Sequence, residues 1–215
     1  NLRARAPVWK ESILITKWQK LDDAWMCAST EINPSLELNQ SSYQAMVLGL
    51  RDYVQKNKFP GIVLGLSGGI DSALSAAIAA DAIGPEKVLC LMMPSPYTSK
   101  NSKDDAVACA NILGTEMIEI PITPLIDAFD NSLKPLFKGL SADKTEENIQ
   151  SRARGVLLMA ASNKMGYMVL TTGNKSEMSV GYATLYGDMC GGYSVLKDIY
   201  KTDIFKICIW RNENI

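Results

Sequence analysis

The stretch that decides the fold of this 215-residue chain reads Ile62-Val63-Leu64-Gly65-Leu66-Ser67-Gly68-Gly69-Ile70-Asp71-Ser72. An aliphatic run typical of a strand is followed by a glycine turn, and the alanine-rich residues 73–83 are typical of a helix. Strand, turn and helix in this order form half of a βαβ unit. The turn therefore lies at a helix N-terminus, where backbone N–H groups and nearby hydroxyls can bind a phosphate.

This turn differs from two common nucleotide-binding motifs. It has neither the Gly-Lys-Ser/Thr ending of a Walker A loop nor the spacing of a dinucleotide fingerprint. Instead, Asp71 places a carboxylate beside the predicted phosphate site, which is repulsive unless a divalent cation lies between them. Asp71 is therefore predicted to bind Mg²⁺. The alternative is that Asp71 only caps the helix.

The rest of the chain alternates between strand and helix patterns. Strands are predicted at 62–66, 88–93, 117–120 and 167–170. Helices are predicted at 41–55, 124–137 and 145–164, and another begins near residue 71. Two more helices are predicted from their caps: one begins at Ser102, with Asp105 as the capping partner, and one begins at Thr202 and runs toward Trp210. Strands separated by helices favour an α/β fold, a doubly wound parallel sheet with helices on both faces.

The order of the strands predicts where a ligand binds. In such a sheet the first three strands extend one way, and the fourth returns to lie beside the first. Ligands bind at this switch point, outside the carboxyl ends of the strands. The turns 67–72 and 171–177 are therefore predicted to meet over one pocket, although they are far apart in the sequence.

These motifs resemble a known family. A strand followed by Ser-Gly-Gly-Ile-Asp-Ser, residues 67–72, resembles the pyrophosphate loop of enzymes that cleave ATP between its α and β phosphates. The motif Thr-Thr-Gly-Asn-Lys-Ser-Glu, residues 171–177, together with residues 145–154 and 181–188, extends the similarity over 42–211 to the synthetase part of glutamine-dependent NAD synthetases. The resemblance implies an adenine nucleotide alpha hydrolase-like (Rossmann-like) fold.

The beginning of the chain resembles a different part of the same family. Residues 7–27 look like the end of the nitrilase-like glutaminase domain that precedes the synthetase. We therefore expect residues 1–35 to be the tail of that domain with a linker, and 36–215 to be a synthetase domain that is incomplete at its C-terminus. Cys27 lies in this tail and is not expected to be the glutaminase nucleophile.

The resemblance implies a carbon–nitrogen ligase. Its reaction would be the ATP-dependent amidation of deamido-NAD to NAD through an adenylated intermediate, with release of AMP and pyrophosphate. Ammonia would come from glutamine in the full-length protein, Mg²⁺ would be the cofactor, ATP a co-substrate, and a homodimer the basic assembly. Ammonia-only relatives carry a lysine where this chain has Leu185 and an arginine near Met92, so these differences fit the glutamine-dependent branch.

The resemblance also assigns roles to residues of this chain. The implied catalytic residues are Asp71, Glu177 and Lys201, and the implied metal ligands are Asp71 and Glu177. The implied ATP-binding residues are Gly65, Leu66, Ser67, Gly68, Gly69, Ile70, Asp71, Ser72, Thr172 and Lys201. The implied deamido-NAD-binding residues are Asn148, Arg152 and Glu177.

Several of these residue types also have simpler explanations. Glu177 could be a first-turn acid that the helix dipole favours, and Arg152 could pair along its own helix with Glu146 or Asn148. Lys175 could be a solvated loop residue. Aromatic residues near the second turn could stack on a ligand ring or simply pack in the fold; they are Tyr182, Tyr186 and Tyr193.

Composition narrows the functional class. The chain is 47% hydrophobic and 21% charged, which is typical of a globular domain with a sizeable core, and its net charge of −1 gives no basis for binding nucleic acid or an anionic membrane. It contains five cysteines without a C-x-x-C pair, and no histidine, so a zinc site and a Ser-His-Asp mechanism are not expected. No apolar run approaches a membrane span of about 20 residues. A cytoplasmic enzyme is predicted.

The sequence leaves three other functions open. A related amidotransferase such as GMP synthetase would keep the first turn but should lack the 171–177 motif. A tRNA-thiolating relative would be expected to show paired cysteines or a basic face. A nucleotide-binding sensor would need the pocket but not two metal-binding carboxylates, so replacing Asp71 with asparagine separates the sensor from the enzyme.

Overall fold

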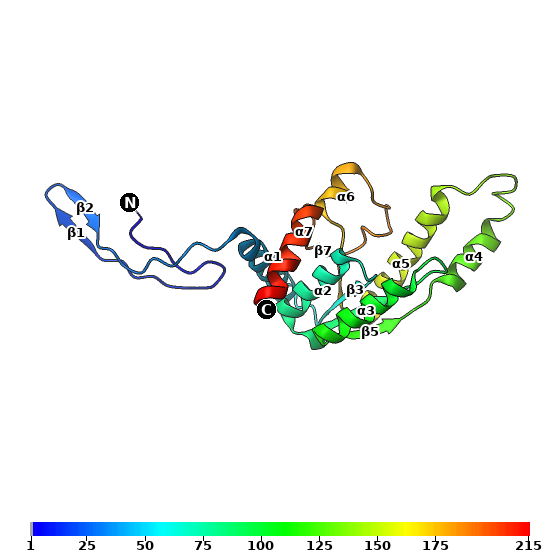
Figure 1. Ribbon diagram of the computed structural model, residues 1–215, viewed down its shortest axis with the longest axis horizontal. Coiled ribbons are helices and arrows are strands. Elements are labelled where there is room, and N and C mark those ends of the chain that lie inside the picture. Colours follow the sequence, from blue (N-terminus) through cyan, green and yellow to red (C-terminus); the bar gives the residue numbers. More distant parts are fainter. Residues whose placement is uncertain (1) are drawn as a thin grey trace.

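A computed structural model describes residues 2–215 and shows a five-stranded sheet between two layers of helices, with an extended arm at the N-terminus (Figure 1). In chain order the elements are β1 (Trp18–Leu21), β2 (Ala24–Cys27), α1 (Leu38–Lys56), β3 (Ile62–Gly65), α2 (Ile70–Ile83), the 3₁₀ turn η1 (Pro85–Lys87), β4 (Val88–Met92), α3 (Lys100–Leu113), β5 (Glu116–Glu119), α4 (Thr123–Leu133), α5 (Lys144–Met165), β6 (Met168–Thr171), α6 (Lys175–Val180), β7 (Tyr193–Ser194) and α7 (Lys201–Asn214).

The sheet has the topology that the sequence predicted. Its strand order is β5-β4-β3-β6-β7, and each neighbouring pair is parallel. The fourth predicted strand lies beside the first, with Ile62 opposite Met168. The strand β7 was not predicted, because two residues are too few for a recognisable alternation of apolar and polar side chains.

Successive residues of the central strands face opposite layers, as the pleat requires. Ile62 and Leu64 of β3 join the core on the side of α1, α2, α3 and α7, whereas Val63 joins the core on the side of α4 and α5. The strands β4 and β6 alternate in the same way. Helices therefore cover both faces of the sheet, which confirms the doubly wound fold.

Helix α1 begins at Leu38, three residues before its predicted start, and two predicted helix caps are wrong. Helix α3 is capped by Ser99, whose Oγ accepts the N–H of Ser102 at 3.1 Å, so Ser102 is the partner of the cap and not the cap itself. Helix α7 begins after Tyr200, and the Lys201 N–H donates to Ser176 Oγ at 3.0 Å. The predicted Thr202 cap is wrong because this helix end is satisfied by a side chain from another element.

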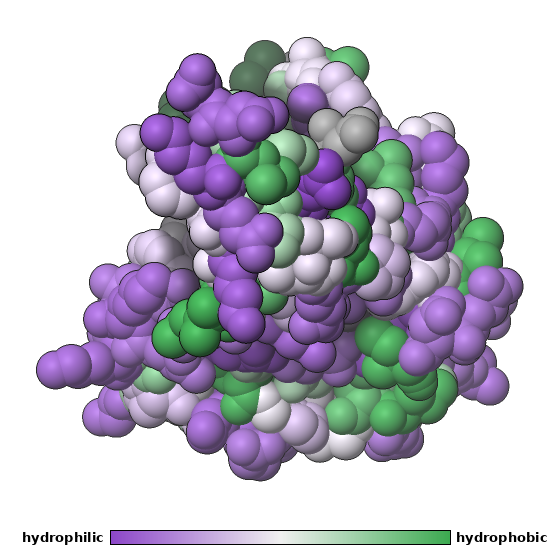
Figure 2. All heavy atoms as spheres, turned by 90° about the vertical axis from the view of Figure 1, so that its left-hand side faces the viewer, coloured by the Kyte–Doolittle hydropathy of each residue, from purple (hydrophilic) through white to green (hydrophobic). Residues whose placement is uncertain are grey.

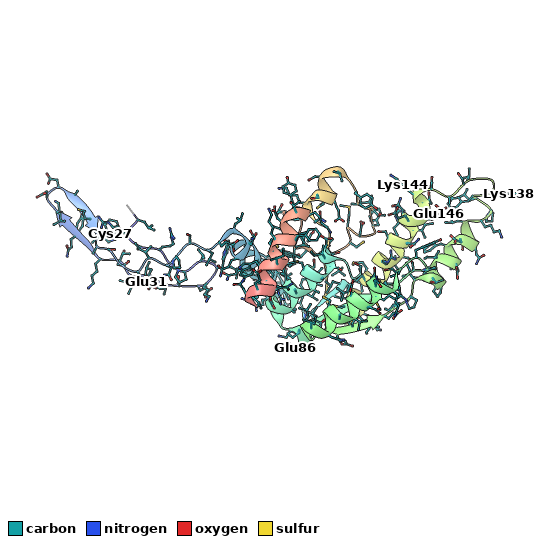
Figure 3. All side chains as sticks on the ribbon, in the orientation of Figure 1. Cys27, Glu31, Glu86, Lys138, Lys144 and Glu146 are labelled. Carbon is teal, nitrogen blue, oxygen red and sulfur yellow. The ribbon has the colours of Figure 1, made fainter. Side chains whose placement is uncertain are left out.

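The N-terminal arm is a separate structural feature. Its strands β1 and β2 form an antiparallel hairpin whose residues are mostly exposed, and it projects away from the five-stranded sheet (Figure 1). The Trp9 indole N–H donates to Ser41 Oγ at 3.0 Å and connects the arm to α1. Cys27 and Glu31 lie on the arm, away from the five-stranded sheet (Figure 3).

The surface at the arm end of the molecule is mainly hydrophilic, and its apolar side chains lie in separate small groups (Figure 2). Within residues 2–215, no helix has both the length and the apolar composition needed to cross a membrane.

A polar cluster joins the helices α1, α2 and α7. Arg211 Nη2 lies 3.1 Å from Asp81 Oδ1, and Arg211 Nε donates to the Tyr43 hydroxyl at 2.7 Å. The Tyr43 hydroxyl donates in turn to Asp81 Oδ2. Burial, followed by the interaction with Asp81, raises the pKa of Tyr43, so this residue remains a neutral donor.

Replacing Arg211 with methionine should destabilise the fold. The side chains of Arg211 and Asp81 are only 17% and 27% exposed, so the change leaves a mostly buried carboxylate without its cation. We expect the free energy of unfolding to fall by about 2 kcal/mol, measured by urea denaturation. Replacing Lys56 with methionine breaks the exposed pair with Asp52 and should cost less than about 0.5 kcal/mol. Equal losses in both variants would contradict this role for Arg211.

Candidate functional site

The glycine turn after β3 is stabilised by hydrogen bonds with its own serine side chains. Gly68 has a φ of +81°, a conformation that glycine adopts without strain. The Ser72 hydroxyl donates to the Gly69 carbonyl at 2.9 Å, and Ser67 Oγ accepts the N–H of Gly69 at 3.2 Å. Because α2 begins at Ile70, the N–H groups of its first turn have no acceptor within the helix.

Asp71 lies in the first turn of α2 but does not cap it. Gly69 occupies the N-cap position, and no side chain makes a cap hydrogen bond there. Each carboxylate oxygen of Asp71 instead contacts a residue from beyond β6: Oδ1 accepts from Asn174 Nδ2 at 3.1 Å, and Oδ2 forms an ion pair with Lys201. The helix-cap alternative for Asp71 is therefore wrong.

The second turn follows β6 and leads into α6. Asn174 caps α6, and its Oδ1 accepts the N–H of Glu177 at 3.0 Å. Glu177 Oε2 accepts the N–H of Asn174 at 3.0 Å, which completes a capping box. Glu177 is thus a first-turn acid of α6, as the simpler explanation holds, but this role uses only its Oε2 atom. Glu177 Oε1 has no hydrogen-bond donor among the residues that the structure describes.

The two turns line adjoining cavities at the carboxyl ends of β3 and β6. The smaller cavity has a volume of about 320 Å³ and contains Asp71 and Glu177. The larger has a volume of about 780 Å³ and extends from the carboxyl end of β4 along α5 from Lys144 to Leu158. Both are lined by Ser67, Thr171, Thr172, Tyr182, Ala183 and Asp188. The predicted convergence of the two turns on one site is confirmed.

The residues proposed for ATP divide between these cavities. Gly69, Asp71 and Ser72 line the smaller cavity, Gly65 and Leu66 line the larger, and Ser67 and Thr172 line both. Gly68 and Ile70 shape the turn without lining either of the two. Lys201 belongs to the site through its ion pair with Asp71.

The residues proposed for the dinucleotide are less closely grouped. Glu177 lines the smaller cavity and Asn148 the larger, whereas Arg152 lines neither of them. Arg152 Nε donates to the Leu185 carbonyl at 3.2 Å, so it holds the segment after α6 and does not pair along its own helix. Asn148 Oδ1 accepts from Thr184 Oγ1 of the same segment at 2.9 Å.

Three of the remaining candidates near the second turn contact protein groups, whereas the fourth, Tyr186, is 73% exposed. Lys175 lies over the Tyr200 ring, 4.6 Å from its centroid. Tyr193 stacks at a tilt against Tyr53, with ring centroids 5.1 Å apart. Tyr182 lines both cavities and donates from its hydroxyl to Glu147 at 3.0 Å, a contact that raises the pKa of Tyr182.

Asn174, Lys144 and Arg154 also belong to the site, and none of them was predicted from the sequence. Asn174 joins the two turns, and its spacing from Glu177 is the signal of a capping box that could have identified it. Lys144 and Arg154 line the larger cavity, and Lys144 lies at the start of α5 near Glu146 (Figure 3). No local pattern marks Lys144 and Arg154, because only the fold places these two helical cations at the cavity.

Cations lie beside the acids of the site. Lys201 occupies the first position of α7, where a cation opposes the helix dipole, and Asp71 offsets this cost. Burial lowers the pKa of the Arg154 guanidinium, whose Nε donates to the Met93 carbonyl at 3.1 Å.

Burial, followed by the charge of Asp71, raises the pKa of Cys208 to about 11, so this thiol is protonated at neutral pH.

Asp71 and Glu177 are the residues that could hold a metal ion. Among residues 2–215 there is no group of three or more His, Cys, Asp or Glu side chains arranged for a metal. A pair of carboxylates still fits Mg²⁺, which usually takes one or two protein carboxylates and completes its shell with phosphates and water. The residues present therefore fit a cation that binds together with a polyphosphate.

A family model described as NAD synthase matches residues 42–214. The chain belongs to the NAD synthase family. The glutamine-dependent NAD(+) synthetase of Rhodobacter capsulatus is 49% identical over 213 residues, which are 99% of this chain and 38% of that relative. The enzyme of the same name from Thermotoga maritima is 54% identical over 181 residues, which are 84% of this chain and 31% of that relative.

A solved member of the NAD synthase family shares the fold. The glutamine-dependent NAD+ synthetase of Acinetobacter baumannii, determined in complex with ADP, superposes with a TM-score of 0.92 at 50% identity. The similarity covers 97% of this chain and 39% of that one. The chain thus spans less than two fifths of the length of these relatives.

Proposed function

We propose that this chain forms the amide-forming part of a glutamine-dependent NAD synthetase. Residues 36–215 would be the synthetase domain, and residues 1–35 would belong to the glutaminase part of the protein. The reaction would convert deamido-NAD to NAD, with ATP cleaved to AMP and pyrophosphate. The observation that carries the proposal is the set of hydrogen bonds by which Asn174 connects Asp71 to Glu177, and so connects the turns 67–72 and 171–177 at one cavity.

The first half-reaction is an adenylation. The nicotinate carboxylate of deamido-NAD attacks the α-phosphorus of ATP, and the bond to the β-phosphate breaks to release pyrophosphate. The turn 67–72 would bind the phosphates through the N–H groups at the start of α2. Lys201 would exchange its contact with Asp71 for the polyphosphate, since its side chain is 39% exposed.

The second half-reaction forms the amide. Ammonia attacks the activated carbonyl carbon, AMP leaves with the bonding electrons, and a proton is released. Neither half-reaction needs a protein nucleophile, because positioning and charge stabilisation supply the catalysis. A chain without histidine is therefore compatible with this chemistry.

Mg²⁺ would be held by Asp71 and Glu177 and would neutralise charge on the phosphates of bound ATP. The ADP complex of the Acinetobacter baumannii relative supports an adenine nucleotide as ligand of this fold. A homodimer and a cytoplasmic location remain predictions.

A product assay tests the proposed function. The natural full-length protein is incubated with ATP, Mg²⁺, deamido-NAD and either glutamine or ammonium. We expect NAD, AMP and pyrophosphate in equal amounts, with pyrophosphate formed only when the dinucleotide is present. Formation of ADP and orthophosphate would exclude adenylation, and turnover of xanthosine monophosphate in place of deamido-NAD would favour a GMP synthetase-like enzyme.

A further inference from the structure

We propose that Asn174 is a positioning residue that fixes the carboxylates of Asp71 and Glu177 in the orientation that binds a divalent cation together with the phosphates of ATP. This inference rests on the proposed function, because it concerns the metal that the site would use. Asn174 has no role among the residues assigned from the family resemblance.

The contacts of Asn174 reach both acids. Its side-chain Nδ2 donates to Asp71 Oδ1 at 3.1 Å, and its backbone N–H donates to Glu177 Oε2 at 3.0 Å. One residue thus provides a donor to each of two carboxylates that lie 106 positions apart in the numbering, on α2 and α6. Two neighbouring carboxylates repel each other, and neutral donors hold them in place without removing the charge that a cation requires.

The orientation of the Asn174 amide is determined by its surroundings. Its Oδ1 accepts the N–H of Glu177 at 3.0 Å, so the opposite side of the amide, Nδ2, must face Asp71. The residue is only 1% exposed, so water does not compete for these contacts. An amide also does not titrate, and the arrangement therefore persists across the working pH range.

Helix capping alone does not explain this residue. Serine, threonine or aspartate would cap α6 about as well as asparagine. Ionised aspartate has no donor for Asp71 Oδ1, and the single hydroxyl of serine or threonine, which lacks the second branch of the amide, cannot span from the Glu177 N–H to Asp71 as Oδ1 and Nδ2 of Asn174 do. The bond to Asp71 is therefore the part of the arrangement that capping does not require.

Asp71 is held differently on its two sides. Asn174 contacts Oδ1 from a buried position, whereas Lys201 contacts Oδ2 and is 39% exposed. Lys201 can therefore turn toward an incoming phosphate while Asn174 keeps its contact. The acid retains its orientation as its cationic partner changes.

The test replaces Asn174 with serine in the natural full-length protein. Serine keeps the cap of α6 but is too short to reach Asp71. The measured quantity is the affinity for Mn²⁺ in the presence of saturating α,β-methylene ATP, followed by electron paramagnetic resonance. We expect the Mn²⁺ affinity to fall by about 10- to 100-fold. Binding of the analogue in EDTA should change by less than about threefold, because Asn174 does not line either cavity.

A matched control is Asp143→Ser, which exchanges one capping residue for another at the start of α5, outside both cavities. It should leave the Mn²⁺ affinity unchanged. If Asn174→Ser does not fold, Asn174→Thr retains the cap and is measured in its place. In steady-state assays a positioning role predicts a lower kcat with little change in the KM for deamido-NAD.

The inference is overturned if the Mn²⁺ affinity of a folded Asn174 variant stays within about threefold of the wild type, which is below the loss typical of such positions. Failure of the proposed function gives a different result. In that case the wild type would release no AMP and pyrophosphate, while the Mn²⁺ titration would still compare the variants.

Discussion

Replacing Asp71 with asparagine is expected to lower kcat by roughly 10²- to 10³-fold while the protein remains folded. The change keeps the size of the side chain but removes the negative charge that would bind Mg²⁺ beside the phosphates. It also removes the ionic partner of Lys201. Pyrophosphate release from ATP and deamido-NAD is the measurement, with thermal denaturation recorded in parallel.

Stability should change little in this variant. The Asp71 side chain is 18% exposed and Lys201 is 39% exposed, so the lysine can take up water or an anion once the pair is broken. Asp104→Asn is the matched control, because Asp104 forms an exposed pair with Lys100 on α3 and lines neither cavity. The control should retain full activity.

The same variant distinguishes an enzyme from a nucleotide sensor. An enzyme loses turnover when Asp71 is neutralised, whereas a sensor that uses only the pocket would bind ATP as before. Unchanged pyrophosphate release in a folded Asp71→Asn protein would contradict the metal-ligand role. It would also remove the main argument for a cation held between the two turns.

The sequence predicted the sheet well because its strands carry strong local signals. The runs of apolar residues in β3, β4 and β6 are buried on both faces, and short Gly or Pro segments separate them from helices. The switch-point rule then placed the turns 67–72 and 171–177 together without any coordinates. The fold and the place where the two turns meet could therefore both be predicted from the sequence.

The parts that could not be predicted depend on distant contacts. The start of α7 is set by Ser176, a residue of another helix, and not by Thr202. The role of Arg152 depends on the carbonyl of Leu185, which only the folded chain brings close. Local sequence propensity does not depend on such distant partners. Predictions of helix ends and side-chain contacts are therefore wrong where tertiary contacts determine them.

Gly68 is required by a contact that the sequence alone does not reveal. In a turn that binds phosphate through its backbone N–H groups, glycine lets the ligand approach closely because it has no side chain. The structure adds a second reason, because a Cβ at Gly68 would lie 2.1 Å from the Ser102 carbonyl oxygen at the start of α3. The turn is therefore pressed against a neighbouring helix even before a ligand binds.

Replacing Gly68 with alanine should consequently be among the most damaging single changes in the chain. A positive φ costs a non-glycine residue about 1–2 kcal/mol, and overpacking against backbone that cannot move away adds about 1–3 kcal/mol. We expect the free energy of unfolding to fall by about 2–5 kcal/mol, measured by urea denaturation. ATP affinity should fall as well, because relief of the clash moves the turn.

Gly139→Ala separates the two contributions. Gly139 has a φ of +86°, close to the +81° of Gly68, but its Cβ would meet no atom within 4 Å. This control should cost only the backbone term of about 1–2 kcal/mol and leave ATP binding intact. Equal losses in the two variants would show that the contact with Ser102 contributes nothing. A larger loss of unfolding free energy at Gly68 would establish that packing against α3 fixes the conformation of the turn 67–72.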